Sequence, residues 1–406
     1  MTLRDSMRTA ALTLAAAIFV FFPASGLAQP GTTLRTLIVG GGPNRMMNEV
    51  GIESNVRYVN HILPHGTPRR VLFADGKADS ATVVYVEPGD KKETPRFRTP
   101  NLPQIDGPST ESEVRGELEA LASDKKQAAT PTLLYFTGHG DPGRHRDFDN
   151  NWFGLWGNQR LTVKDLATEI DQFPKETPLT LVMVQCFSGG FGNILFKSAD
   201  PKGEFEDRPI AAFFASIAEW PAAGCTAEVN EANYHDFTTY FFAALTGVDR
   251  MGNPVSGADY NHDGKVGMDE AFAYTLIHDD SIDTPVDTSD VFLRRFVNTA
   301  DVVTFAQSFS HVLEWATPAQ RAALEALAAE LKFSGDRSPL EAFNILNGKG
   351  RRKFGRDELW DAKVLRFARL VKSVVLAHDL NESHDIKLKQ EYAALVKRES
   401  ENPLRP

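Results

Sequence analysis

Cysteine is scarce in this chain of 406 residues, which contains only Cys186 and Cys225. Two thiols cannot build a disulfide framework or a four-cysteine zinc site, so both kinds of protein are excluded. Basic residues are also in deficit, with 44 lysines and arginines against 54 aspartates and glutamates and a formal net charge of −10. A chain of this charge has no bulk attraction for nucleic acid or an anionic membrane, and we expect neither as a partner.

Long apolar runs are missing from the sequence after its first thirty residues. The chain begins with Arg4 and Arg8, continues with an apolar run over residues 10–22 and then has small residues at 26–28. This order is typical of a secretory signal peptide, residues 1–28, with cleavage after Ala28; an uncleaved anchor is the alternative. We therefore expect an exported protein, periplasmic or secreted, with no membrane span after signal cleavage.

The rest of the composition is that of a folded protein. Hydrophobic residues make up 42% and charged residues 24%, values that exclude a mainly disordered chain. The length favours two folded units, and the charge pattern places their boundary near residue 300, because the acidic excess lies in residues 29–300 and residues 301–406 are slightly basic. The sequence implies no particular oligomeric state.

Continuous apolar runs alternate with helical periodicity in residues 29–300. The expected strands lie at 37–39, 71–73, 83–86, 133–136, 179–184 and 211–217. Runs that are apolar throughout are typical of strands buried on both faces, so we predict an α/β three-layer sandwich with a mainly parallel sheet. Residues 301–406 repeat apolar side chains at helical spacing and predict an all-helical C-terminal segment without a catalytic constellation.

Two residues that can carry chemistry follow expected strands. His139 lies after the run 133–136, and Cys186 lies after the run 179–184. If these strands are neighbours, both side chains emerge at the same edge of the sheet, where such sheets bind ligands. An imidazole beside a thiol can take its proton or stabilise the thiolate, which is the nucleophilic form.

Each of these residues alone is more often structural, since a single cysteine is usually a small buried hydrophobe. Their matching positions, and the glycines beside both, favour a catalytic Cys–His dyad. The flanking glycines let backbone N–H groups approach a reacting carbonyl, and the N–H groups of Gly140 and Cys186 are the expected oxyanion donors.

The two motifs, LLYFTGHGD at 133–141 and LVMVQCFSGG at 181–190, resemble those of the caspase-like cysteine peptidases, the group that includes caspases, legumain, gingipains and clostripain. The resemblance covers about residues 35–300. It implies a caspase-like sandwich and an endopeptidase acting on peptide or protein substrates. It also implies Cys186 as the nucleophile, His139 as the general acid and base, and no cofactor for the reaction itself.

The residues that select the substrate are less clear. The resemblance implies that the side chain before the scissile bond lies along the segment after the nucleophile, where Ser216 and Glu228 are candidate substrate-binding residues. Gln185, directly before the cysteine, is a third candidate. An acidic pocket would favour lysine or arginine, but a surface glutamate is the commoner explanation of Glu228, so the preferred side chain stays open.

Residues 259–270, DYNHDGKVGMDE, match the twelve-residue loop of an EF-hand. Gly264 stands at the sharp turn of that loop. We expect Ca²⁺ to bind through the side chains of Asp259, Asn261, Asp263 and Glu270 and the main-chain carbonyl of Lys265. The usual entering helix is missing, because the helical pattern before the loop ends near Gly247; an acidic surface turn is the alternative.

Cys225 adds a further alternative. In an oxidising compartment it can pair with Cys186 and block the nucleophile, but a packed or free Cys225 is favoured because an active nucleophile must stay unpaired. The sequence therefore predicts an exported cysteine endopeptidase with a structural or regulatory calcium ion. The alternative is a catalytically inactive, calcium-dependent binding module on the same fold.

Overall fold

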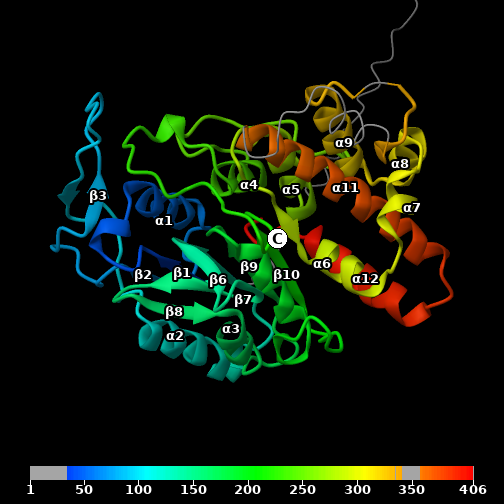
Figure 1. Cartoon of the computed structure of the whole chain (residues 1–406). Coiled ribbons are helices and arrows are strands. Elements are labelled where there is room, and N and C mark those ends of the chain that lie inside the picture. Colours follow the sequence, from blue (N-terminus) through cyan, green and yellow to red (C-terminus); the bar gives the residue numbers. More distant parts are fainter. Residues whose placement is uncertain (1–33, 334, 341–356, 406) are drawn as a thin grey trace, which may run out of the picture. The chain divides into compact units, whose positions relative to one another are not determined.

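A six-stranded sheet forms the centre of the computed structural model, which describes residues 34–333, 335–340 and 357–405. The predicted signal peptide lies outside these residues. The strand order is β11-β10-β9-β5-β1-β2, and all neighbours are parallel except the short antiparallel edge strand β11 (Figure 1). The strands are β1 (Arg35–Gly40), β2 (Arg69–Phe73), β5 (Thr132–Thr137), β9 (Leu179–Met183), β10 (Ile210–Phe214) and β11 (Val286–Asp287).

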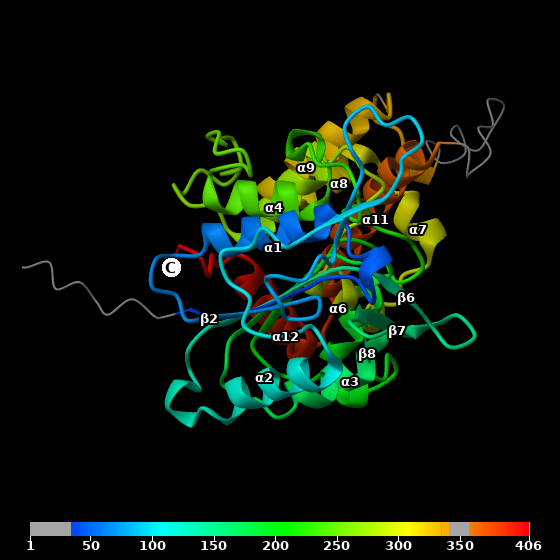
Figure 2. The same cartoon turned by 90° about the vertical axis from the view of Figure 1, so that its left-hand side faces the viewer.

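Helices cover both faces of this sheet, as the continuous apolar strands predicted (Figure 2). One face packs against α1 (Val50–Ile62), α4 (Phe237–Thr246) and α5 (Met268–His278), and the other against α2 (Glu111–Ser123) and α3 (Val163–Ile170). Neighbouring residues of one strand enter opposite cores, since Tyr135 lies with the first group of helices and Phe136 with the second. The fold is mixed α/β with a mainly parallel central sheet.

Two small antiparallel sheets were not anticipated. The run at 83–86 forms a pair outside the central sheet, β3 (Val83–Tyr85) with β4 (Arg96–Arg98). A three-stranded sheet follows His139 directly: β6 (Gly140–Gly143), β7 (Asp147–Leu155) and β8 (Gln159–Thr162). The short 3₁₀ helices are η1 (Arg45–Met47), η2 (Lys125–Gln127), η3 (Ser188–Leu195), η4 (Lys197–Ala199) and η5 (Glu231–Asn233).

The C-terminal segment is helical where it is described. Its elements are α7 (Asp301–Phe305), α8 (Phe309–Trp315), α9 (Pro318–Glu330), α11 (Glu358–Glu382) and α12 (Ile386–Glu399), preceded by α6 (Thr288–Phe296). Leu324 and Val371 belong to the same hydrophobic cluster as Phe241 of α4, so one core continues across residue 300. The described residues accordingly form one compact unit. None of the described helices combines the length and the apolar character needed to cross a membrane.

Candidate active site

His139 and Cys186 lie at the same edge of the sheet because the strands before them are neighbours. Strands β5 and β9 pair in parallel with Phe136 opposite Met183. His139 comes two residues after β5 and Cys186 three residues after β9. The chain segments are in close contact there, since a Cβ atom added to Gly140 would lie 2.3 Å from the carbonyl oxygen of Cys186. Only glycine permits this approach.

The imidazole of His139 is bound by a carboxylate. Its Nε2 lies 2.9 Å from Oε2 of Glu49, the residue before α1, and both side chains are mostly buried. Burial by itself lowers the pKa of His139, but interactions with Cys225 and Glu49 outweigh it and raise the pKa to about 11. The imidazole is therefore cationic at neutral pH. Glu49 was not predicted from the sequence. It could have been found as a carboxylate that follows a buried strand and a glycine turn, which places it at the same sheet edge as His139.

The sulfur of Cys186 contacts the loop after β10. It accepts a hydrogen bond from the backbone N–H of Ala222 at 3.3 Å, and the thiol can donate to the Ala222 carbonyl at 3.5 Å. Burial and the nearby Cys225 raise the pKa of Cys186 to about 11, while the Ala222 N–H works in the opposite direction. This donor is therefore the group that favours the thiolate in an otherwise unfavourable environment.

The chain turns sharply directly after Cys186. Phe187 has φ +60° and ψ +19°, a left-handed conformation that costs a non-glycine residue free energy. Buried Asn151 of β7 holds this turn, donating from Nδ2 to the carbonyls of Phe187 at 2.8 Å and Ala218 at 2.9 Å. The sheet that follows His139 thus also supports the turn that follows Cys186.

Cys225 lies close to the same histidine. Its sulfur is 3.3 Å from the carbonyl oxygen of Gly138, and both cysteines are free thiols. Cys225 influences the protonation of both His139 and Cys186. The thiol that interacts directly with His139 in the structure is therefore that of Cys225, while Cys186 shares the sheet edge with this histidine.

The three candidate substrate-binding residues have different environments. Gln185 is 1% exposed, and neither atom of its side-chain amide has a hydrogen-bond partner among the described residues. Ser216 is fully buried, and its hydroxyl binds the carbonyls of Trp220 and Pro221 and the hydroxyl of Thr284. It therefore holds the loop after β10. Glu228 is exposed and accepts a hydrogen bond from Asn233.

Comparison with known proteins adds little to this site. No protein-family model matches the sequence, and no curated protein matches it. Among solved structures, the crystal structure of protein GSU0716 from Geobacter sulfurreducens superposes with a TM-score of 0.35 at 11% identity, covering 63% of this chain and 92% of that one. A likeness this distant supports no conclusion about function.

The predicted calcium loop is built around its own acidic side chains. Asp259 accepts hydrogen bonds from the backbone N–H groups of Asp263 and Gly264, and Asp263 accepts one from Lys265. Glu270, 2% exposed, accepts from the N–H groups at 260, 261 and 267. Gly264 has φ +86°, as the turn requires. Across the described residues, no three acidic, histidine or cysteine side chains converge as metal ligands.

This loop lies at the opposite edge of the sheet from His139 and Cys186. It borders a cavity of about 500 Å³ whose wall includes Pro131, Pro178 and Pro209, the residues that precede β5, β9 and β10. The C-terminal tail completes the wall, with Asn402 donating to the carbonyl of Val266 at 2.9 Å. An ion in the loop would act on the fold and would not touch a substrate at the other edge.

Proposed function

We propose that this protein is an exported cysteine endopeptidase in which Cys186 is the nucleophile and His139 its acid–base partner. The observation that carries the proposal is the alignment of β5 and β9, which places both residues at the carboxyl edge of the sheet, with Glu49 2.9 Å from the imidazole. A carboxylate that orients an imidazole at the same sheet edge as a thiol suits an activated sulfur nucleophile. The caspase-like family remains a resemblance in the two motifs.

The proposed reaction has two steps. In the first, the Cys186 thiolate attacks the peptide carbonyl carbon, the C–N bond breaks, and the imidazolium of His139 gives a proton to the leaving amine. In the second, His139 accepts a proton from water as the water attacks the acyl-enzyme, the C–S bond breaks, and the acid is released with the thiolate and the imidazolium restored. Backbone N–H groups of Gly140 and Cys186 stabilise the developing oxyanion.

The protonation state of His139 fits the first of these roles. Held cationic by Glu49 and Cys225, the imidazole has a proton ready for the leaving group. The amide of Gln185, buried and without a partner next to the nucleophile, is the best-placed group for a substrate hydrogen bond. The buried Ser216 hydroxyl is already hydrogen-bonded within the loop after β10. Glu228 is exposed and could contact only a more distant part of a substrate.

Calcium and export belong to the same proposal. The loop at 259–270 has the ligand spacing of an EF-hand, and its place at the amino edge of the strands suits a structural or regulatory ion. The apolar run at 10–22 supports export through a signal peptide.

A peptidyl acyloxymethyl ketone, which alkylates an activated cysteine, tests the function directly. We expect labelling of the wild type at Cys186, none in Cys186→Ala and a loss of about a hundredfold or more in His139→Ala. Cys225→Ala is the matched control, since it removes the other thiol near the histidine. Labelling that persists in Cys186→Ala but disappears in Cys225→Ala would contradict the assignment, and no labelling of any folded variant would favour the inactive binding module.

A further inference from the structure

Helix α11 of the C-terminal segment reaches the loop that joins α5 to β11 through one buried arginine. The Arg366 side chain is 1% exposed. Its guanidinium donates to three backbone carbonyls of this loop, those of Asp283 at 2.6 Å, Asp279 at 2.5 Å and Ser281 at 2.9 Å. One side chain thereby fixes the path of five consecutive residues.

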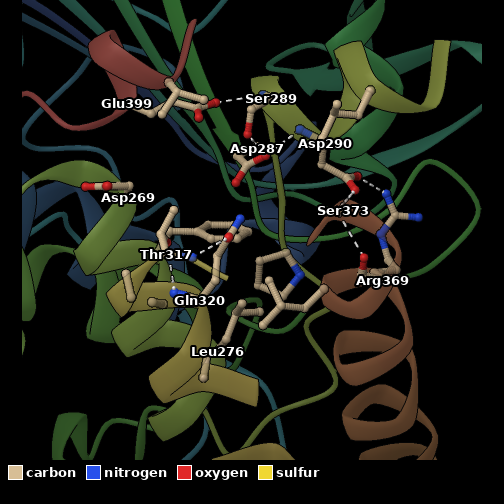
Figure 3. Close-up of a pocket in the computed structure, with 18 of the residues that line it drawn as sticks. Asp269, Leu276, Asp287, Ser289, Asp290, Thr317, Gln320, Arg369, Ser373 and Glu399 are labelled. Atoms are coloured by element: carbon tan, nitrogen blue, oxygen red, sulfur yellow. Dashed lines mark hydrogen bonds and ion pairs between the residues drawn. The ribbon is translucent and has the colours of Figure 1, made fainter. Parts of the chain in front are cut away.

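A second contact holds the same helix next to this loop. Arg369, one turn along α11, and Ser373 both bind the carboxylate of Asp290 in α6, and Figure 3 shows these three side chains turned toward one another beside a cavity of about 80 Å³. Helix α11 is therefore anchored on both sides of β11.

The loop 279–283, which Arg366 binds, in turn holds the segment 216–223 after β10. This segment contacts the sulfur of Cys186. The fully buried Asp283 accepts hydrogen bonds from the backbone N–H of Ala223 at 2.6 Å and from that of Phe237 at 2.9 Å. The residue before Ala223 is Ala222, whose N–H donates to the sulfur of Cys186 at 3.3 Å. Two neighbouring peptide groups are thus fixed, one on Asp283 and one on the sulfur.

The other end of the segment 216–223 is held by Thr284, the residue after Asp283. The hydroxyl of Thr284 accepts a hydrogen bond from the N–H of Ile217 at 3.2 Å and contacts that of Ser216 at 3.0 Å. Residues 283 and 284 therefore bind the two ends of the segment 216–223. The positions of residues 283 and 284 depend in turn on the loop 279–283, which Arg366 binds.

We infer that Arg366 is a positioning residue for Cys186: through the 279–283 loop and Asp283 it keeps the Ala222 N–H hydrogen-bonded to the nucleophile. The inference rests on the proposed role of Cys186, and it gives the C-terminal segment a part in the reaction at the sheet edge. An N–H donor stabilises a thiolate more than a thiol, so losing its alignment should reduce the reactivity of the sulfur.

Other charges near the sulfur do not replace this donor. The groups that act on Cys186 are Cys225, Asp283 and Asp141, with His139 on the neighbouring strand end. Burial and the charge of Asp279 raise the pKa of Asp283 well above its usual range. The charge of Asp283 itself raises the pKa of Cys186, so the way in which Asp283 favours the thiolate is by holding Ala223.

Arg366→Met in the full-length protein tests the inference. The readout is the rate at which iodoacetamide alkylates Cys186 between pH 7 and 10, resolved from Cys225 by peptide mass spectrometry. We expect a rate roughly tenfold lower at pH 8, as for the loss of one hydrogen bond to a charged group. An unchanged or faster rate would overturn the inference.

Arg208 supplies a matched control. It is also buried, donates to three backbone carbonyls (those of Ile170, Asp171 and Phe173) and lies 3.5 Å from an aspartate, as Arg366 does. It precedes β10, at the edge of the sheet away from Cys186. Arg208→Met should therefore leave the Cys186 rate unchanged, and an equal loss in both variants would show a general effect of destabilisation and sink the idea.

A second variant keeps the test decisive if Arg366→Met does not fold. Asp283→Leu keeps the approximate shape of the side chain but removes both acceptors, and so breaks the hydrogen bonds from Ala223 and Phe237. It should also slow alkylation of Cys186, and wild-type kinetics would contradict the inference. Alkylation requires no peptidase activity. A protein that fails the ketone-labelling test can therefore still show the Arg366 effect, and the two proposals fail separately.

Discussion

At the scale of single residues, the site depends on what surrounds His139. A histidine in isolation titrates near pH 6.5, but this imidazole has Glu49 at 2.9 Å and Cys225 nearby, which raise its pKa to about 11. Because this folded-state value lies above the unfolded one, the pairing contributes stability that is complete below pH 6.5 and is lost as the pH rises toward 11.

Glu49→Gln should lower the pKa of His139, because the amide keeps a hydrogen-bonding oxygen but removes the negative charge. The pKa should stay above 6.5, since Cys225 is unchanged. Two-dimensional NMR of the imidazole as a function of pH measures it. Glu228→Gln, at an exposed glutamate, is the control and should leave the titration of His139 as in the wild type. Identical curves for all three proteins would show that Glu49 does not hold the imidazole.

At the scale of elements, the ends of strands decide where chemistry occurs. The start of β6 lies directly against the chain at Cys186, and this contact exists only because residue 140 has no side chain. The EF-hand-like loop is at the other end of the same strands, where it meets the C-terminal tail. Each end can be tested independently.

Gly140→Ala should abolish ketone labelling of Cys186, since the added methyl would lie 2.3 Å from the Cys186 carbonyl and force β6 away from it. The cost in stability should be about 1–3 kcal/mol, typical of overpacking, so the protein should still fold. Gly154→Ala is the control on the neighbouring strand β7, because its Cβ would have 3.4 Å to the nearest atom. Full labelling of Gly140→Ala would mean that this close contact is not needed.

Calcium should raise the melting temperature of the wild type, because an ion that binds only the folded loop stabilises the fold. Without an entering helix the loop is less preorganised, and we expect an affinity in about the 10⁻⁵ to 10⁻³ M range. Asp263→Asn should remove most of the shift while its amide oxygen still caps the Lys265 N–H. Asp249→Asn, in the preceding turn, should retain the shift. No heat of calcium binding at millimolar concentration would identify the loop as an acidic turn only.

At the scale of the whole molecule, the C-terminal helices and the sheet share one core, and buried acids lie where they meet. Burial raises the pKa of Asp279 to about 6, and that of Asp269 and Asp287 to the same region. For such acids the folded state binds protons more tightly than the unfolded state. The stability associated with them is complete below pH 3.8 and is lost as the pH rises through 6.

The free energy of unfolding should therefore fall between pH 4 and pH 7, with Asp279 alone accounting for up to about 3 kcal/mol. Asp279→Asn should flatten the dependence in urea denaturation series at several pH values. Asp171→Asn is the control, because Asp171 pairs with a buried arginine at the same 3.5 Å but is half exposed. A slope that is the same in both variants would show that Asp279 is not the group that titrates.

Most strands of the central sheet could be predicted from the sequence. Five of the six central strands were predicted near their observed places, because a strand buried on both faces must be apolar throughout. The placement of His139 and Cys186 after two neighbouring strands followed from the same pattern. The sheet β6–β8 was not predicted, because β6 and β8 have four residues each and β7, although nine residues long, begins with a polar stretch.

What the sequence by itself determined about this protein is what is written in consecutive residues: the parallel strands, the glycines beside His139 and Cys186, and the ligand spacing of the loop at 259–270. Only the tertiary structure decided which distant groups meet. Glu49 contacts His139 from 90 residues away in the sequence, and Cys225 lies beside the same histidine. Arg366 binds a loop more than 80 residues before it in the sequence. These contacts are made by single polar side chains with no periodic signal, and packing across the sheet and α11 alone brings them together.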